Sequence, residues 1–231
     1  MRYAILSDIH GNQYALSEVL KQVDELGITK LLLLGDYVGY YYGIAHILKA
    51  LAKYEVHTIK GNHEELLQRA IEEPCFLKAI DAKYGASHRL CINGLSHEQL
   101  EHLIGLPASL ELDLEGVKVL LCHGSPWDID AYVYPDADEE TKSRYDAYNF
   151  DYIFFGHTHY CTGFDRENMH VINPGSVGQS RQKGGAAYWG LLDTEQQQYE
   201  QMTTPYKVDE LKKEIQMHNP ELDYNQRVLT R

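Results

Sequence analysis

Short hydrophobic runs along the first two thirds of the chain each end in a cluster of Asp, His or Asn residues. The polar clusters that directly follow these runs are Ser7-Asp8-Ile9-His10, Gly35-Asp36, Lys60-Gly61-Asn62-His63-Glu64, His123-Gly124 and Gly156-His157-Thr158-His159. Runs of about four to six apolar residues between turn residues are typical of buried strands. Because ligands bind beyond the carboxyl ends of strands in open α/β sheets, we expect these clusters to converge on one site.

The segments between the runs carry hydrophobic residues at helical spacing. This spacing predicts helices over 13–26, 44–53 and 64–72, a mostly helical stretch over 74–105, a surface helix within 136–148 and a final amphipathic helix over 208–217. Runs 110–113 and 117–122 predict a hairpin, and further strands are expected at 152–155, 162–164, 170–172, 187–193 and 198–202. Residues 219–231 form a polar tail whose order the pattern leaves open.

The alternation of strands and helices predicts the fold class. Alternation of this kind indicates βαβ units and a partly parallel sheet, while the second half is rich in strands. We therefore predict an α/β fold, a four-layer α-β-β-α sandwich of two mixed sheets with flanking helices. The chain of 231 residues is long enough for one such domain with a real core. We place the domain at 1–205 and a helix and tail attached to it at 206–231.

Charge and composition narrow the class of function. The formal net charge of −13 argues against a broad nucleic-acid-binding face, which is normally basic. The hydrophobic runs are too short to cross a bilayer, and no export signal precedes the first run, so we expect a cytoplasmic protein without a membrane partner. The cysteines form no CxxC pair and are expected to be reduced thiols: Cys75, Cys91, Cys122 and Cys161.

The residue types at the five strand ends are those of a metal centre. Carboxylate, imidazole and amide ligands suit Mn, Fe, Zn, Ni or Co. The candidate ligands are Asp8, His10, Asp36, Asn62, His123, His157 and His159. This is too many for one tetrahedral site, and it fits two divalent ions that share Asp36 as a bridging carboxylate.

The charge of such a centre favours a phosphate substrate. Two divalent ions, the carboxylates of Asp8 and Asp36 and a bridging hydroxide leave the site at about +1. A metal pair is suited to in-line attack of the hydroxide on phosphorus, because it generates the nucleophile and stabilises the developing charge. His63 adjoins the ligand Asn62 and is a candidate general acid for the leaving-group oxygen.

In this order, the five blocks resemble the signature of the calcineurin-like metallophosphoesterase superfamily. The segment Asn173-Pro174-Gly175-Ser176 is similar to the NPGS segment of its small bacterial and archaeal phosphodiesterase branch, and the resemblance spans roughly residues 1–195. It implies a β-sandwich flanked by helices and a binuclear centre, with His63 as catalytic acid. It further implies that one ion is held by Asp8, His10, Asp36 and His159, and the other by Asp36, Asn62, His123 and His157.

The substrate pocket is less defined by the sequence. Where the branch often continues Gly-Tyr-Gly-Pro, this chain reads Gly39-Tyr40-Tyr41-Tyr42-Gly43, which leaves the course of this loop open. Aromatic residues after Asp36 and after His123, among them Tyr132 and Tyr134, would form a wall for a base or aryl group, or else pack the loops or cover a dimer interface. The predicted substrate contacts are Tyr40, Trp127, Asn173 and Arg181. The histidines outside the blocks are expected at the surface or in packing: His46, His57, His88, His97, His102, His170 and His218.

The sequence thus predicts a metal-dependent phosphoesterase. A phosphodiesterase acting on a small molecule or nucleotide is favoured, with Asp36 and His63 as the catalytic residues. A phosphomonoesterase of the same fold, a non-catalytic metal-bound interaction scaffold and a nuclease are the alternatives, and the acidic charge counts against the last. The expected partner is the small phosphoester itself; the sequence does not decide whether the protein forms a homo-oligomer.

Overall fold

The computed structural model describes residues 1–231 and contains two mixed sheets of five strands each. The first sheet has the order β10-β9-β1-β2-β3 and the second β4-β5-β6-β8-β7. The strands of the first are β1 (Arg2–Leu6), β2 (Lys30–Leu33), β3 (Glu55–Thr58), β9 (Ala186–Asp193) and β10 (Gln198–Pro205). Those of the second are β4 (Ser109–Leu114), β5 (Val117–Cys122), β6 (Tyr152–Phe154), β7 (Cys161–Arg166) and β8 (Met169–Pro174).

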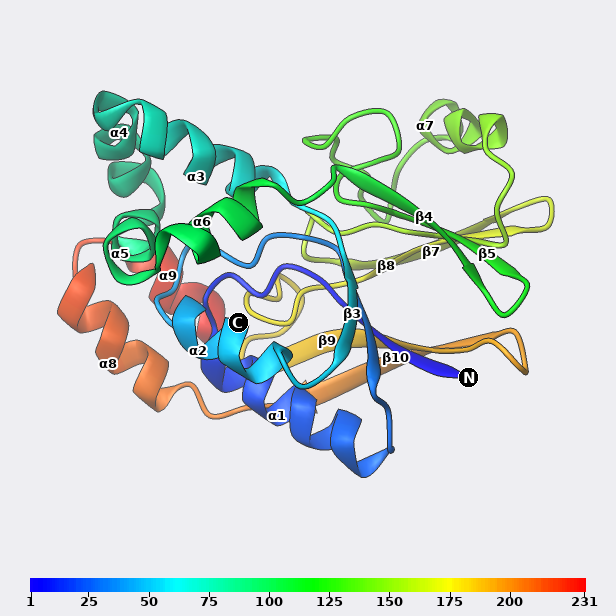
Figure 1. Ribbon diagram of the computed structural model, residues 1–231, viewed down its shortest axis with the longest axis horizontal. Coiled ribbons are helices and arrows are strands. Elements are labelled where there is room, and N and C mark those ends of the chain that lie inside the picture. Colours follow the sequence, from blue (N-terminus) through cyan, green and yellow to red (C-terminus); the bar gives the residue numbers. More distant parts are fainter.

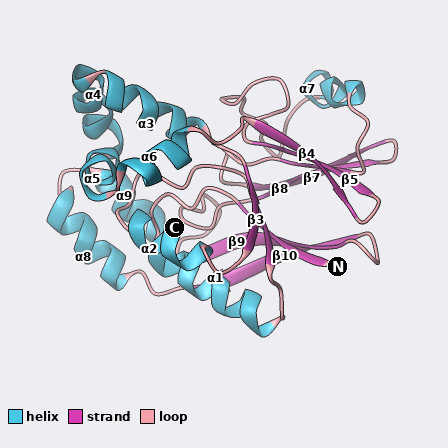
Figure 2. Cartoon of the chain, viewed as in Figure 1, coloured by secondary structure: helices cyan, strands magenta, loops and turns pink.

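The helices lie outside the two sheets (Figures 1 and 2). In chain order they are α1 (Gln13–Glu25), α2 (Ile44–Leu51), α3 (Asn62–Glu72), α4 (Pro74–Tyr84), α5 (Ser87–Gly94), α6 (His97–Ile104), α7 (Glu139–Ser143), α8 (Asp209–His218) and α9 (Asp223–Arg227). Short 3-10 helices follow at Arg144–Ala147 and Val228–Thr230. None of the helices is long and apolar enough to span a membrane.

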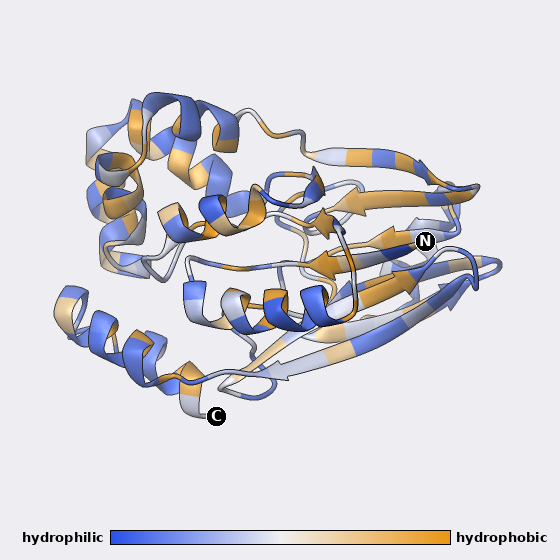
Figure 3. Cartoon of the chain, turned by 60° about the horizontal axis from the view of Figure 1, so that its bottom comes forward, coloured by the Kyte–Doolittle hydropathy of each residue, from blue (hydrophilic) through white to orange (hydrophobic).

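Alternating side chains on the strands divide the core into layers. Ile5 and Leu32 of the first sheet pack against Leu121 and Phe154 of the second. The neighbouring side chains of β1 point to the other face, where α1 and α2 cover them. The outer face of the second sheet is covered by the segment around Tyr145. The predicted four-layer α-β-β-α sandwich is therefore confirmed, and Figure 3 shows the hydrophobic residues concentrated along its strands.

Parallel pairing brings the ends of several strands to one edge of the sandwich. Strand β1 pairs in parallel with β2, and β2 with β3, while β5 pairs in parallel with β6. The predicted hairpin is also confirmed, because β4 and β5 pair antiparallel in direct sequence. Figure 1 shows α3 to α6, α8 and α9 gathered beyond the end of the sheets toward which β1 runs. The carboxyl end of β1 therefore lies under a cover of helices.

One local prediction was wrong, and another is met by a shorter element than expected. The hydrophobic run that ends before Lys60 was expected to be a buried strand, but the strand it forms, β3, is the outer strand of its sheet, and the side chains of β3 are half-buried or exposed. The surface helix expected within 136–148 is present as the short α7, none of whose residues is buried, and a 3-10 helix follows it. A hydrophobic run cannot distinguish a central from an edge strand, since that depends on which strands pair.

The C-terminal tail is ordered and packs on the rest of the molecule. The Oδ1 atom of Asn219 accepts hydrogen bonds from the Tyr42 hydroxyl and from the backbone N–H of Ala86, both at 2.9 Å. Val228 and Leu229 are buried in the same core as α1 and α2. The tail therefore connects the loop after β2 with the corner between α4 and α5.

Removing the Asn219 side chain should loosen this connection. We expect Asn219→Ala to lower the free energy of unfolding by about 1–3 kcal/mol, because it leaves the Ala86 N–H without its partner in a buried place. Denaturant unfolding measures this change. Asn149→Ala, at an exposed position, is the matched control and should change the free energy of unfolding by less than about 0.5 kcal/mol. Equal effects of the two substitutions would contradict the bridging role of Asn219.

Candidate metal centre

The structure brings the predicted ligands together beyond the carboxyl ends of five strands, β1, β2, β3, β5 and β6. All of them except Asn62 are buried, and each of the buried ligands exposes 5% or less of its area. They are Asp8, His10, Asp36, Asn62, His123, His157 and His159. Residues from positions 8 to 159 thus share one buried site, as the strand-end pattern predicted.

One group of ligand atoms surrounds a common point. It consists of Asp8, His10, Asp36 and His159, whose ligand atoms all lie within 4.8 Å of one another. The Nε2 atoms of His10 and His159 are 3.0 Å apart, and Oδ1 of Asp8 lies 3.3 Å from the latter. Ligand atoms bonded to one transition-metal ion at about 2.0–2.3 Å have spacings of this size.

A second group shares Asp36 with the first. Its Oδ2 atom lies 3.5 Å from Nε2 of His10 and 3.3 Å from Nε2 of His123. The Oδ1 atom of Asn62 lies 3.1 Å from Nε2 of His123 and 3.0 Å from Nδ1 of His157. The second group is therefore Asp36, Asn62, His123 and His157. Asp36 lies between the two groups, the position that a bridging carboxylate would take.

Backbone carbonyl groups orient three of the four imidazole rings. Nδ1 of His10 lies 2.8 Å from the Val38 carbonyl oxygen, and Nδ1 of His123 lies 2.7 Å from that of Leu34. His159 makes the equivalent contact with the carbonyl of Gln179 at 2.8 Å. An N–H at Nδ1 that donates to these carbonyls leaves the Nε2 lone pair directed into the site, as metal ligands require.

The backbone at the ligands is held in an uncommon conformation. Five of the seven have a positive φ angle between 49° and 68°: Asp8, His10, Asp36, His157 and His159. Only four other residues that are neither ligands nor glycine share this property, and Tyr40, beside the ligands, is one of them. Left-handed conformations cost energy for residues with a side chain and persist where the surroundings enforce them. The strain is therefore concentrated at this site.

The donor set fits bound cations. Oδ1 of Asp8 is buried without any hydrogen-bond partner. When both rings carry their proton on Nδ1, the facing Nε2 atoms of His10 and His159 each present a lone pair and cannot hydrogen-bond to each other. Buried carboxylates and lone pairs without partners are costly, and a divalent ion between them removes this cost. Burial lowers the pKa of His10 to about 4, so this ring is neutral and able to coordinate.

Glu64 stabilises the loop that carries Asp36. Its buried carboxylate accepts hydrogen bonds from the backbone N–H groups of Asp36 at 2.8 Å, Tyr37 at 2.9 Å and Gly61 at 2.8 Å. The last of these contacts also caps the N-terminus of α3, the helix that begins with Asn62. A single side chain therefore fixes two ligand-bearing segments relative to each other.

His63 lies against the ligands without being one of them. Its backbone N–H donates to Oδ1 of Asp36 at 2.9 Å, and its ring is 4.8 Å from that of His10, measured between centroids. Nδ1 of His63 is buried without a partner. The ring also stacks on His88 at 5.3 Å. Burial lowers the pKa of His63, so the ring is neutral until an anion lies beside it.

The predicted substrate contacts divide into two pairs. Tyr40 lies at the site, with its ring 4.7 Å from that of His10, and Arg181 lies near Tyr40. Trp127 instead packs edge-on against Tyr145, with ring centroids 4.8 Å apart. Asn173 is buried and its Nδ2 donates to the Gly156 carbonyl at 2.6 Å and to the Thr158 hydroxyl at 3.1 Å. The geometry thus places Asn173 behind the ligand loop after β6, where it shapes that loop.

Sequence reasoning missed residues that reach the site from distant segments. His88 was expected at the surface or in packing, and it does pack: its ring is completely buried against His63, with neither ring nitrogen hydrogen-bonded. Its place beside the metal ligands was not foreseen. Tyr84 of α4 lies 4.7 Å from the His63 ring, and Tyr224 of α9 lies 6.4 Å from Tyr40. No motif surrounds these residues, and only the packing of helices over the site brings them there.

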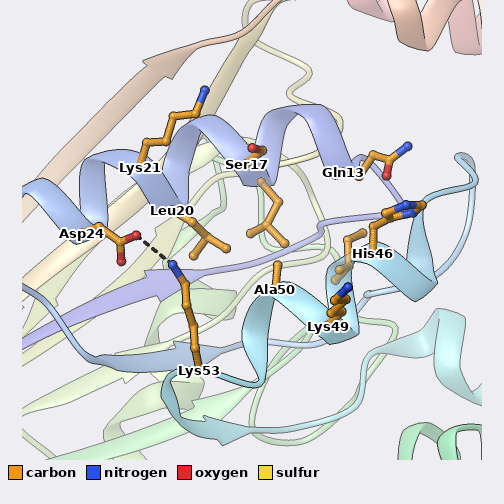
Figure 4. A pocket seen from close by; sticks show the side chains of 11 residues that line it. Gln13, Ser17, Leu20, Lys21, Asp24, His46, Lys49, Ala50 and Lys53 are labelled. Atoms are coloured by element: carbon orange, nitrogen blue, oxygen red, sulfur yellow. Dashed lines mark hydrogen bonds and ion pairs between the residues drawn. The ribbon is translucent and has the colours of Figure 1, made fainter.

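A separate surface pocket lies between α1 and α2 (Figure 4). Its volume is about 410 Å³, and its lining includes Lys21, Lys49 and an ion pair of 2.8 Å between Asp24 and Lys53. None of the metal-ligand candidates lines it. This pocket is therefore separate from the metal centre.

The charge on His123 leads to a test of metal binding. Burial lowers the pKa of His123, but the carboxylates of Asp36 and Asp8 outweigh this effect and raise it to about 10. The metal-free protein therefore carries a proton on this ring at pH 8, and coordination through Nε2 must displace it. We expect Mn²⁺ binding to release about one proton and to strengthen as the pH rises toward 10.

Calorimetric titration with Mn²⁺ in two buffers of different ionisation enthalpy measures this proton release. His46→Ala, on the surface of α2, is the control and should release the same number of protons as the unchanged protein. Binding without proton release, or with an affinity that does not change between pH 6 and pH 9, would contradict the assignment of His123 as a ligand.

Comparisons with known proteins agree with this geometry. Residues 1–197 match the family model of the calcineurin-like phosphoesterase superfamily domain. The uncharacterized protein MJ0912 of Methanocaldococcus jannaschii is 29% identical over 224 residues, which cover 89% of this chain and 88% of that protein.

Solved structures share the fold. The hypothetical protein PH1004 from Pyrococcus horikoshii OT3 superposes with a TM-score of 0.87 at 22% identity, over 100% of this chain and 98% of that one. A metallophosphoesterase from Sphaerobacter thermophilus does so with a TM-score of 0.78 at 22% identity, over 99% and 98% of the two chains. The family match over most of the chain confirms the resemblance of the five blocks, and the chain belongs to the calcineurin-like phosphoesterase superfamily.

Proposed function

We propose that this protein is a metal-dependent phosphodiesterase that hydrolyses a small phosphoester at a binuclear centre. The observation that carries this proposal is the pair of ligand groups that share Asp36, together with the Asp8 oxygen that has no partner. One ion would be held by Asp8, His10, Asp36 and His159, and the other by Asp36, Asn62, His123 and His157. Mn, Fe, Zn, Ni and Co all suit these donors.

The ions, when bound, would supply an activated water as nucleophile and would polarise the phosphoryl oxygens. The residues of the chain set the geometry of this chemistry. Asp36 contributes negative charge to both groups through Oδ2, while its Oδ1 holds the backbone of His63 in place. The site excludes bulk water, since its carboxylates and imidazoles are almost completely buried, and this strengthens its electrostatic interactions.

His63 is the residue that we expect to donate a proton to the leaving oxygen. Its Nδ1 atom is free of other hydrogen bonds, and its ring borders the group that contains His10. An anionic substrate beside the ring favours the protonated form, which opposes the effect of burial on the pKa of His63. The proton would move from the ring to the alcohol oxygen as the ester bond breaks.

Aromatic rings on two sides of the site support a diester over a monoester. Tyr40 and Tyr84 border His63, while Tyr132 lies 4.3 Å from the ring of His157 on the other side. A diester carries an organic group on each of two oxygens, and both groups would then meet apolar surface. A monoester has only one such group to place.

The first test is hydrolysis by metal-stripped protein before and after addition of Mn²⁺, Ni²⁺, Zn²⁺ or Mg²⁺. We expect turnover to return with metal and to favour bis-p-nitrophenyl phosphate over p-nitrophenyl phosphate. Asp36→Asn should bind metal at least about tenfold more weakly and lose nearly all turnover, because it removes the shared charge. Preference for the monoester would indicate a phosphatase, and binding of two ions without turnover would favour the scaffold alternative.

A glycine beside His63 gives a second test. A Cβ atom on Gly39, whose φ angle is +96°, would lie 2.2 Å from Nδ1 of His63. Gly39→Ala should therefore shift the ring and lower kcat by about 10²-fold, while metal content is retained. His63→Ala should lower kcat by roughly 10²–10⁴-fold and also keep the metal.

Gly116→Ala is the matched control for Gly39→Ala. Gly116 has a φ angle of +90° with no atom within 4 Å of its added Cβ, so it carries the same backbone strain of about 1–2 kcal/mol without a clash. We expect this variant to lose stability but to keep kcat. If Gly39→Ala and Gly116→Ala had the same kcat, contact with His63 would not be the reason for Gly39.

A further inference from the structure

Four tyrosines from four separate segments lie around the metal ligands and His63, in contact either with one of these residues or with one another. We call them the tyrosine collar: Tyr40, Tyr84, Tyr132 and Tyr224. They come from the loop after β2, from α4, from the loop after β5 and from α9. The last of these lies beyond residues 1–197, the part of the chain that matches the family model. The collar is therefore assembled by elements that lie far apart in the sequence, one of them outside the family-model match.

Each collar ring touches the site or another collar ring. Tyr40 lies 5.2 Å from His63, and its ring centroid is 5.4 Å from that of Tyr84. Tyr224 lies 6.4 Å from Tyr40 on the side of the C-terminal tail. These spacings fall in the range of interacting aromatic rings. Tyr40, Tyr84 and Tyr224 therefore form a continuous aromatic surface on the side of His63, while Tyr132 lies on the other side, against the ring of His157.

The collar faces solvent progressively from its base to its rim. Tyr40 is 8% exposed, Tyr84 and Tyr224 are half-buried, and Tyr132 is 55% exposed on the loop after β5. Tyr132 therefore leaves an aromatic ring exposed beside the ring of the ligand His157. The collar therefore presents ring faces to whatever approaches the ligands.

Positive charge lies within the collar. Arg181 is close enough to Tyr40 and Tyr132 for its charge to lower the pKa of both phenols, against the larger raising effect of burial. The Nε atom of Arg181 is buried without a partner. The ammonium group of Lys83 lies 4.6 Å from the centroid of the Tyr84 ring. These cations favour an anionic ligand.

Aromatic residues bind both quaternary ammonium groups and nucleobases, and the two cations favour the second kind of ligand. A cage of tyrosines is a known arrangement for quaternary ammonium groups. Arg181 and Lys83 would repel such a group, and Lys83 already covers one face of Tyr84. A nucleobase has an uncharged π-face that stacks on tyrosine, and its phosphate is anionic. The net charge of −13 in turn disfavours a long nucleic-acid polymer.

We propose that the tyrosine collar binds the base of a small nucleoside phosphodiester, with Arg181 beside its phosphate. This inference rests on the proposed phosphodiesterase function and names the substrate class of that same site. Tyr132, the most exposed ring, and Tyr224, on the side of the tail, offer the faces on which the base stacks, and Tyr40 lies between Tyr224 and the ligand His10.

Binding of two nucleotide fragments that differ only in the base tests the collar. Adenosine 5′-monophosphate and ribose 5-phosphate are titrated into the Mn²⁺-loaded full-length protein by calorimetry. We expect the nucleotide to bind roughly 5-fold to 150-fold more tightly, the gain that base–aromatic stacking provides. Equal affinities would overturn the collar proposal, and so would tighter binding of glycerophosphocholine than of the nucleotide.

Substitutions in the collar test which tyrosines produce the preference for the nucleotide over ribose 5-phosphate. Tyr132→Ala and Tyr224→Ala should each lower the affinity ratio of the two fragments toward one, whereas Tyr132→Phe should preserve it, because stacking needs only the ring. Tyr132 is exposed on a loop, so its substitution tests the proposal even where Tyr224→Ala disturbs the tail. Tyr54→Ala is the control, because the Tyr54 hydroxyl contacts Asp24 away from the site, and we expect its affinity ratio to be unchanged. An unchanged ratio in Tyr132→Ala would overturn the proposal.

The same protein samples separate this inference from the proposed function. Hydrolysis of bis-p-nitrophenyl phosphate without any preference for the nucleotide would overturn the collar proposal and leave the phosphodiesterase standing. A preference for the nucleotide without hydrolysis of any ester would overturn the phosphodiesterase and leave a metal-dependent nucleotide-binding site.

Discussion

The structure depends on the burial of two carboxylates and four imidazoles at one point between the ends of two sheets. Such groups are stable away from water only when each has a partner, and Asp8 retains a buried oxygen without one. Five of the seven ligands take left-handed backbone angles to direct their side chains to this point. The folded chain therefore has an unfavourable local free energy at this point, which bound divalent ions would offset.

Contacts behind the ligands maintain this arrangement. Backbone carbonyl groups orient His10, His123 and His159, and Glu64 joins the loop of Asp36 to the start of α3. These contacts hold the short loops that follow the strands, so the ligand atoms are fixed in place by buried hydrogen bonds. The packing of the four layers therefore also determines the geometry of the centre.

A second level of organisation closes the site from outside. Helices α4 and α5 supply Tyr84 and His88, and the C-terminal tail supplies Tyr224. Asn219 joins the tail to both the loop after β2 and the corner between α4 and α5. Three segments that are distant in the sequence therefore stabilise one another around the ligands. The centre resembles that of the family, whereas this cover determines what reaches it.

The sequence by itself determined the sandwich and the position of the ligands along the chain. Strand ends are local features, because a hydrophobic run followed by Asp, His or Asn is visible without knowledge of the partners of that strand. Parallel pairing then brings such ends to the same edge of a sheet. For this reason the pattern at Asp8, Asp36 and His123 was sufficient to predict that these residues lie at one site.

Only the tertiary structure decided which other side chains face the ligands. His88 and Tyr224 lie in helices whose sequence shows no motif, and the outer position of β3 depends on which strands pair. Trp127 follows a ligand in sequence but packs against Tyr145, because the loop turns its ring toward the outer face of the second sheet. Contacts between distant segments arise from packing over the whole chain, which local patterns do not encode.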